Sequence, residues 1–249
     1  MAKESKQPQL SFVGHLDELR TRLMISIGAV VAVAGLAYFF SEKILQILLQ
    51  PIQTTGSPVY FFSPADAFII KIKIALFAGF ILASPVIISQ IWLFVVPALH
   101  EREKGMILPW IAATSLLFLA GISFCFFGVI PIALKFLMGF QTDFLKPMIS
   151  VTSYVDFLWN LSLAFGIAFN LPVVVIILSS LGVVKVKTLT QYRKHAIVLI
   201  FIVAAVITPT PDMATQALLA IPLIFLYELG ILGARVMGRR KRENHAGFN

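Results

Sequence analysis

The sequence predicts an all-α polytopic membrane protein, and three features of its 249 residues support this prediction. Hydrophobic residues make up 59% of the chain and charged residues only 13%, whereas soluble domains carry about 25% charged residues. A soluble protein of this length needs polar groups to cover its surface, while lipid solvates apolar side chains directly. The apolar residues also gather in six stretches along the chain, which predicts six transmembrane helices.

The six apolar stretches differ in length. They cover residues 23–40, 67–96, 107–139, 154–181, 194–208 and 214–235. A helix needs ~20 residues to cross the hydrocarbon layer, so the fifth stretch is short and predicts local thinning of the bilayer, while the second and third predict tilted or projecting helices. We predict one transmembrane domain over 23–235, preceded by a cytoplasmic amphipathic segment, 1–22, and followed by a basic cytoplasmic tail, 236–249.

Prolines lie within or beside several of these stretches, and each removes a helical hydrogen bond and tends to kink the helix. They are Pro85, Pro109, Pro131, Pro172 and Pro222. Transmembrane helices tolerate proline, but several kinked helices together favour a curved wall over a straight bundle.

The distribution of basic residues predicts the orientation. With the amino terminus in the cytoplasm and six crossings, 15 of the 20 Lys and Arg residues fall in cytoplasmic segments and 5 in external ones. Because cytoplasmic loops carry the excess of Lys and Arg, both termini are predicted to be cytoplasmic. The same bias accounts for the net charge of +8 without nucleic-acid binding.

The external segment 41–66 contains an amphipathic stretch, Ser41 to Gln50, which we expect Pro51 to stop. A turn-forming cluster follows over residues 54–58. A short helix lying across the outer face is therefore predicted. A second external turn lies at Thr208-Pro209-Thr210-Pro211-Asp212, where two prolines separate the last two apolar stretches.

No pattern in the chain predicts catalysis, a metal site or a cofactor. Cys125 is the only cysteine, and the four histidines are scattered, so no metal-ligand spacing is present. No phosphate-binding glycine loop or nucleophile–base arrangement is found either. Enzymatic function is not predicted.

A few polar residues near or within the membrane are candidates for binding. Glu18 and Arg22 are four residues apart and can pair on a solvated amphipathic helix, on which Leu16, Leu19 and Leu23 share one face. The turn from Pro97 to Lys104 mixes acids and bases, which is typical of a solvated loop. Asn170 and Gln216 fall within apolar stretches, where polar residues either function or form interhelical hydrogen bonds. Glu228 lies nearer the inner end and could pair with Arg235 or reach the membrane interface.

Five blocks of sequence resemble the TatC family. The first is His15-Leu16-x-Glu18-Leu19-Arg20-x-Arg22-Leu23, and the second runs from Ser84-Pro85-Val86-Ile87 through Gln90-Ile91-Trp92-x-Phe94-x-x-Pro97-Ala98-Leu99 to Glu101–Glu103. The others are Ala164-Phe165-Gly166-x-x-Phe169-x-x-Pro172-Val173, the Thr208–Asp212 turn, and Gln216-x-Leu218-Leu219-Ala220-Ile221-Pro222. They run in register over residues 15 to about 235.

The resemblance implies a six-helix, glove-like receptor subunit of the twin-arginine protein translocase in the bacterial cytoplasmic (inner) membrane. TatC-like proteins bind twin-arginine signal peptides of folded precursors, assemble with TatA- and TatB-like single-span proteins and with further copies of themselves, and use the protonmotive force without a cofactor. By resemblance, Glu18 and Glu103 receive the two signal arginines. Phe94 flanks the site, Arg20 and Leu16 belong to the same binding motif, Pro51 matches a proline of the first external cap, and Asp212 matches the acid of the external turn.

Asn170 departs from the family pattern, which typically has a membrane-embedded Glu or Gln at this position. Asn keeps an amide but cannot titrate, so we expect polarity rather than a proton to matter here.

Two other functions stay open on the residues alone. A small-solute transporter would need a midplane site and usually repeats, and a membrane scaffold would need neither.

Overall fold

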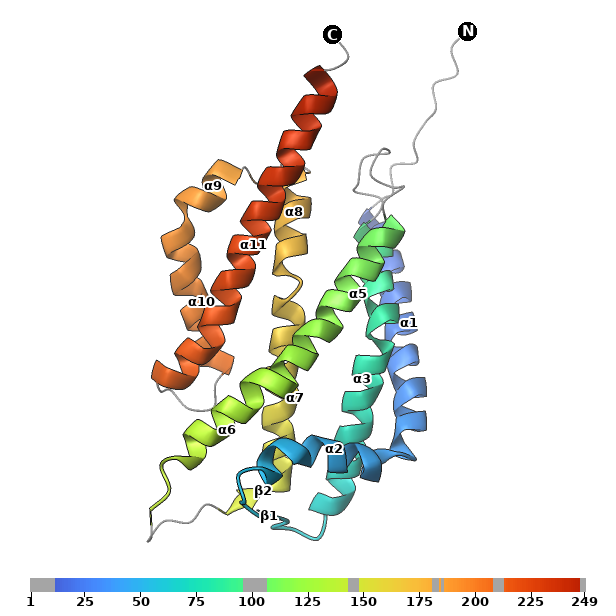
Figure 1. Cartoon of the computed structure of the whole chain (residues 1–249). Helices are drawn as coiled ribbons and strands as arrows, with labels where there is room; N and C mark the ends of the chain where they lie inside the picture. Colours follow the sequence, from blue (N-terminus) through green and yellow to red (C-terminus); the bar gives the residue numbers. More distant parts are fainter. Residues whose placement is uncertain are drawn as a thin grey trace.

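The computed structural model describes residues 12–95, 107–142, 148–180, 184, 186–207 and 213–246. Its described helices run mostly along one direction, with one shorter helix lying across them (Figure 1). We call the end marked by this transverse helix the cap end. The opposite end, where the first helix begins and the last one finishes, is the termini end (Figure 1).

The amino-terminal half forms a helical hairpin closed by the transverse helix. Helix α1 (Phe12–Tyr38) descends to the cap end, α2 (Ser41–Gln53) lies across it, and α3 (Asp66–Val95) returns beside α1 (Figure 1). At 1.5 Å per residue, the 30 residues of α3 extend for about 45 Å, which exceeds the ~30 Å hydrocarbon layer.

The third predicted span is one long tilted helix with a local change of pitch. It comprises α5 (Ile107–Phe124), a π-helical turn η2 (Cys125–Val129) and α6 (Ile130–Met138). Pro131 lies in the first turn of α6, where its missing N–H leaves a carbonyl of the preceding turn free and the wider π-turn absorbs the mismatch. A change of pitch therefore accompanies Pro131, while the predicted kink at this residue stays a prediction.

The fourth predicted span is broken into α7 (Val151–Ala168) and α8 (Leu171–Ser180). The interruption falls at Phe169 and Asn170, which are three and two residues before Pro172. Pro172 supplies no N–H to the carbonyl of Ala168 one turn earlier, so the helix is interrupted at the place where a kink was predicted.

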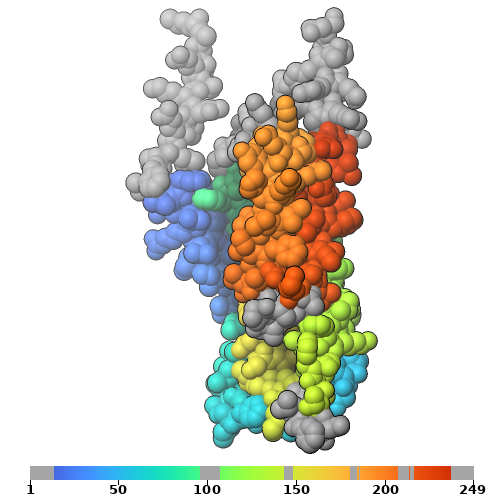
Figure 2. Space-filling view, turned by 90° about the vertical axis from the view of Figure 1, so that its left-hand side faces the viewer, coloured from blue at the N-terminus to red at the C-terminus, as the bar shows by residue number. Residues whose placement is uncertain are grey.

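The carboxy-terminal part contains the short α9 (Val186–Gln191), then α10 (Arg193–Ile207) and α11 (Met213–Ala246). Figure 2 shows these three elements, in orange and red, over the upper part of the face that it presents. Helix α11 continues without interruption from the apolar stretch to Ala246, so much of the predicted basic tail is helical.

Five helical stretches in the described residues are long and apolar enough to cross a membrane. They are Gly14–Tyr38, Asp66–Val95, Ile107–Met138, Val151–Ser179 and Gln216–Val236. The predicted fifth span corresponds to α10, whose 15 residues are fewer than the ~20 a full crossing requires. The count of six crossings therefore stays a prediction.

Large apolar side chains on the outside of the helices point away from the protein. Leu36 is 67% exposed, Phe127 76% and Val206 81%. Such side chains are compatible with lipid rather than water around the helices.

The hydrophobic core includes the cap end, where α2 packs against α3, α6 and α7. Ile52 of α2 and Ile74 of α3 are fully buried there, and the Tyr154 hydroxyl donates to the Leu48 carbonyl oxygen at 2.8 Å. Strands β1 (Val59–Tyr60) and β2 (Ile149–Ser150) pair in parallel and join two cap segments.

Candidate functional site

The candidate site lies at the termini end of α1 and α3, which pack side by side (Figure 1). The Arg22 guanidinium donates from Nη2 to Glu18 Oε1 at 3.1 Å and from Nη1 to Gln90 Oε1 at 3.2 Å. The predicted pairing of Glu18 with Arg22 is therefore confirmed. The hydrogen bond from Arg22 to Gln90 connects this ion pair on α1 to α3.

An aromatic contact lies beside this polar cluster. The rings of His15 on α1 and Phe94 on α3 stack, with centroids 4.4 Å apart and an interplanar angle of 20°. Phe94 follows Gln90 by one helical turn, just as His15 precedes Glu18 by about one turn, so the polar and aromatic contacts form two adjacent layers. A carboxylate beside an aromatic surface suits a ligand that combines cationic and apolar groups.

The motif residues around Glu18 are open to the surroundings. Leu16, Leu19 and Leu23 are exposed, and so is Arg20. An apolar strip therefore runs along α1 next to the carboxylate. Neither Leu16 nor Arg20 takes part in the contacts with Gln90 and Phe94 just described.

A close crossing of the two helices fixes their separation. A Cβ atom added to Gly79 of α3 would lie 2.7 Å from Ala34 Cβ and 2.8 Å from Ala34 Cα on α1. Only glycine permits this approach, because real Cβ contacts this short are essentially never seen. Gly79 thus sets how near Gln90 and Phe94 come to α1.

Two of the predicted site residues lie outside the described residues. Glu103 falls in 96–106 and Asp212 in 208–212. The predicted turns at Pro97–Lys104 and Thr208–Asp212 fall in the same two segments.

Asn170 lies at the break between α7 and α8. Its amide Nδ2 donates to the Gly166 carbonyl oxygen at 3.0 Å, within its own chain segment. Its Oδ1 atom is buried and has no hydrogen-bond partner among the described residues. A buried oxygen without a hydrogen-bond donor lowers the stability of the folded protein. A donor that reached Asn170 Oδ1 would remove this cost.

Gln216 and Glu228 both hold α11 against α10. The Gln216 side chain donates to the Phe201 carbonyl oxygen at 2.7 Å, an interhelical hydrogen bond of the kind common between membrane helices. The suggested pairing of Glu228 with Arg235 is wrong, because Glu228 pairs with Arg193 at 2.8 Å. Arg235 lies two turns farther along α11, about 10 Å away along the axis, while α10 begins beside Glu228.

Pro51 does not stop the amphipathic helix, contrary to expectation. Helix α2 runs to Gln53 with Pro51 inside it, and the Pro51 side chain is buried. Because the helix ends two residues later, the proline disturbs only its last turn. The turn that follows contains Gly56 with a φ of +73°, a conformation that favours glycine.

An ion pair near the cap end was not anticipated. Lys73 Nζ contacts both carboxylate oxygens of Asp156, at 2.6 and 2.8 Å, and joins α3 to α7. The two side chains are 35% and 48% exposed, so the pair connects the two halves of the protein without being fully desolvated.

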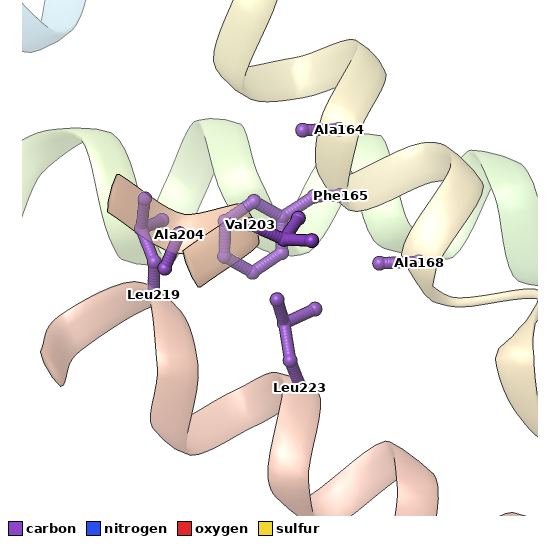
Figure 3. Close-up of a pocket in the computed structure, with 7 residues that line it drawn as sticks. All are labelled: Ala164, Phe165, Ala168, Val203, Ala204, Leu219 and Leu223. Carbon is purple, nitrogen blue, oxygen red and sulfur yellow. The ribbon is translucent and has the colours of Figure 1, made fainter. Parts of the chain in front are cut away.

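The cavity drawn in Figure 3 lies where α7, α10 and α11 meet. It measures about 40 Å³, and all of its lining side chains are apolar, among them Phe165, Val203 and Leu223. Sites for small molecules usually exceed about 300 Å³ and include placed polar groups. This cavity therefore does not supply the midplane solute site that a small-solute transporter requires.

Sequence reasoning named Glu18 and Phe94 as site residues but assigned no role to Gln90 or His15. The available signal was spacing, since Gln90 and Phe94 are four residues apart and share a face of α3. No group of three or more His, Cys, Asp and Glu side chains that could hold a metal ion occurs in the described ranges.

Comparison with known proteins identifies the family. A sequence profile described as Sec-independent protein translocase protein (TatC) matches residues 14–222. The chain belongs to the TatC family. It is 42% identical over 233 residues to the TatC protein of Aquifex aeolicus, covering 92% of this chain and 96% of that protein. It is 43% identical over 221 residues to TatC of Carboxydothermus hydrogenoformans, covering 89% and 91%.

The structural comparison agrees with the sequence match. A crystal structure of the twin-arginine translocase receptor TatC superposes with a TM-score of 0.80 at 42% identity, covering 89% of this chain and 98% of that one. The chain is thus an all-α, multi-span membrane protein with the TatC fold. It is a protein translocase component and not an enzyme.

Proposed function

We propose that this chain is the signal-recognising receptor subunit of a twin-arginine translocase. The observation that carries the proposal is the Glu18 carboxylate, held by Arg22 about one helical turn from the His15–Phe94 stack at the termini end of a TatC fold. Glu103 supplies the second carboxylate in this proposal, Arg20 orients the acidic surface, and Leu16 offers apolar contact. Two acids from separate segments would select a paired-arginine ligand, because each guanidinium can pair with a carboxylate through two parallel hydrogen bonds.

The rest of the assembly follows from the same proposal. Both termini face the cytoplasm of a bacterial inner membrane, so segment 1–22 presents Glu18 to precursors, 23–235 forms the membrane domain and 236–249 the basic tail. TatA- and TatB-like single-span proteins join the complex, this chain associates with further copies, and the protonmotive force drives transport. Pro51 in the external cap and Asp212 in the external turn belong to the opposite face.

Replacing Glu18 with Gln is expected to weaken binding of an Arg-Arg signal peptide by at least about tenfold, because one charge-assisted hydrogen-bonding partner is lost. The measurement is peptide binding to the detergent-purified protein, with a Lys-Lys peptide for comparison and Glu103→Gln in parallel. The wild type should prefer Arg-Arg over Lys-Lys, and either substitution should reduce that preference. Equal binding of both peptides, unaffected by the substitutions, would mean that the acids are ordinary surface charges.

Asn170 is proposed to act after binding, by keeping that depth of the membrane domain polar. Asn170→Leu is then expected to impair export of a precursor while leaving Arg-Arg peptide binding unchanged. Asn170→Gln, which keeps the amide, serves as the matched control and should retain export. Normal export by the leucine variant would contradict this role.

A further inference from the structure

The carboxylate assigned to the signal is already engaged by an arginine of the same chain. Glu18 Oε1 accepts from Arg22 Nη2 at 3.1 Å, and the two side chains are only 23% and 28% exposed. Among the described residues, Arg22 is the one group that contacts the Glu18 carboxylate. Within the described part of the chain, the Glu18 carboxylate thus has one oxygen occupied by a guanidinium, while Oε2 has no partner.

The occupied oxygen affects arginine and lysine ligands differently. A guanidinium pairs best with a carboxylate through a two-pronged contact that uses both oxygens, whereas an ammonium is a point charge that one oxygen can serve. An incoming arginine can therefore make its full contact only if Arg22 releases Oε1. An incoming lysine can bind at Oε2 while Arg22 stays in place.

Gln90 gives the released Arg22 a partner. Its Oε1 already accepts from Arg22 Nη1 at 3.2 Å, through a different nitrogen from the one that holds Glu18. A neutral amide does not attract the signal's charge as strongly as a carboxylate does. Arg22 can therefore release Glu18 and still keep a hydrogen bond to Gln90 of α3. The exchange does not leave its guanidinium without a hydrogen-bond partner at a partly buried interface.

We propose that Arg22 is an internal competitor that sets the affinity of the site. It occupies Glu18 when no signal is bound, yields the carboxylate to a signal arginine, and is retained by Gln90 during the exchange. This inference rests on the proposed function, because it assumes that Glu18 binds a signal arginine. In this scheme Gln90 is a positioning residue, since it acts on the ligand only through Arg22.

The test is a double-mutant cycle read by peptide binding to the detergent-purified full chain. Arg22→Gln is expected to raise affinity for an Arg-Arg peptide about threefold, the scale of displacing one helical ion pair, and affinity for a Lys-Lys peptide by less. Gln90→Leu should lower Arg-Arg affinity about twofold in the wild-type background. In the Arg22→Gln background, Gln90→Leu should have no effect.

The outcomes separate this inference from the proposed function. If Arg-Arg preference is absent in the wild type and Glu18→Gln changes nothing, the proposed function fails. If that preference is present and depends on Glu18, two results overturn internal competition alone. One is an unchanged or lowered Arg-Arg affinity in Arg22→Gln, and the other is an equal effect of Gln90→Leu in both backgrounds, which would mean that Gln90 contacts the ligand or only supports the fold.

Arg22→Met, which keeps the apolar stem, is the second variant if Arg22→Gln does not purify as a folded protein, and the same expectations apply to it.

Discussion

Gly121→Leu is expected to destabilise the protein by about 3 kcal/mol or more, at the upper end of the effects of overpacking. Gly121 of α5 faces the α7–α8 break so closely that an added Cβ would lie 2.6 Å from the Phe165 carbonyl oxygen and 2.8 Å from Phe169 Cγ. A backbone oxygen cannot rotate away as a flexible side chain can, so the two helices must separate. The same crossing holds Gly166, whose added Cβ would meet the Phe118 ring at 2.7 Å.

The single cysteine provides a direct measurement of this effect. Cys125 lies one turn beyond Gly121 and is fully buried, so its reaction with a maleimide requires the helices to open. The labelling rate in detergent should rise strongly in Gly121→Leu and little in Gly128→Leu, because the nearest atom to an added Cβ at Gly128 is 3.9 Å away. Equal rates in both variants would show that the α5–α7 crossing does not control the stability of this region.

Gly79→Leu is the second change with a large expected effect, and its effect falls on binding as well as on stability. The added side chain would collide with Ala34 of α1, including its backbone, so α1 must move away from α3. The contacts from Arg22 to Gln90 and from His15 to Phe94 span this interface. We therefore expect loss of Arg-Arg peptide binding by about tenfold or more, together with a loss of stability of about 3 kcal/mol.

The matched control for Gly79→Leu is Gly35→Leu on the facing helix. Gly35 is the neighbour of Ala34 in sequence, but an added Cβ there meets nothing within 4 Å. Peptide binding and thermal unfolding, measured side by side, should be close to wild type in this variant. If Gly79→Leu binds the Arg-Arg peptide as tightly as Gly35→Leu does, the spacing of α1 and α3 is not what builds the site.

Local patterns in the sequence predicted the local features of this structure. The Glu18–Arg22 pair follows from helical spacing, and the break before Pro172 follows from the chemistry of proline. Pro51 shows where the same rule fails, because a proline close to the end of a helix costs too little to stop it earlier.

Contacts between distant segments could not be predicted from the sequence. Gln90 is 68 residues from Arg22, and Arg193 is 35 residues from Glu228. Local spacing can mark the face on which Gln90 lies, but it does not say which residue of another helix that face meets, since the choice depends on how helices cross. Close crossings at glycines, such as Gly79 against Ala34, decide that geometry, and their partners are invisible in a single sequence.

Helix α1 packs against little of the rest of the described chain, which makes local opening easiest there. Among the described elements, α3 is the one against which α1 packs extensively. Only 11% of the most apolar segment of α1 is buried inside the protein. Regions with few buried contacts open most readily, so backbone amides of α1 should exchange with solvent deuterium sooner than those of α7 wherever water reaches them. The carboxylate of Glu18 is thus carried by the least anchored long helix, and a ligand bound there and to α3 should slow that exchange.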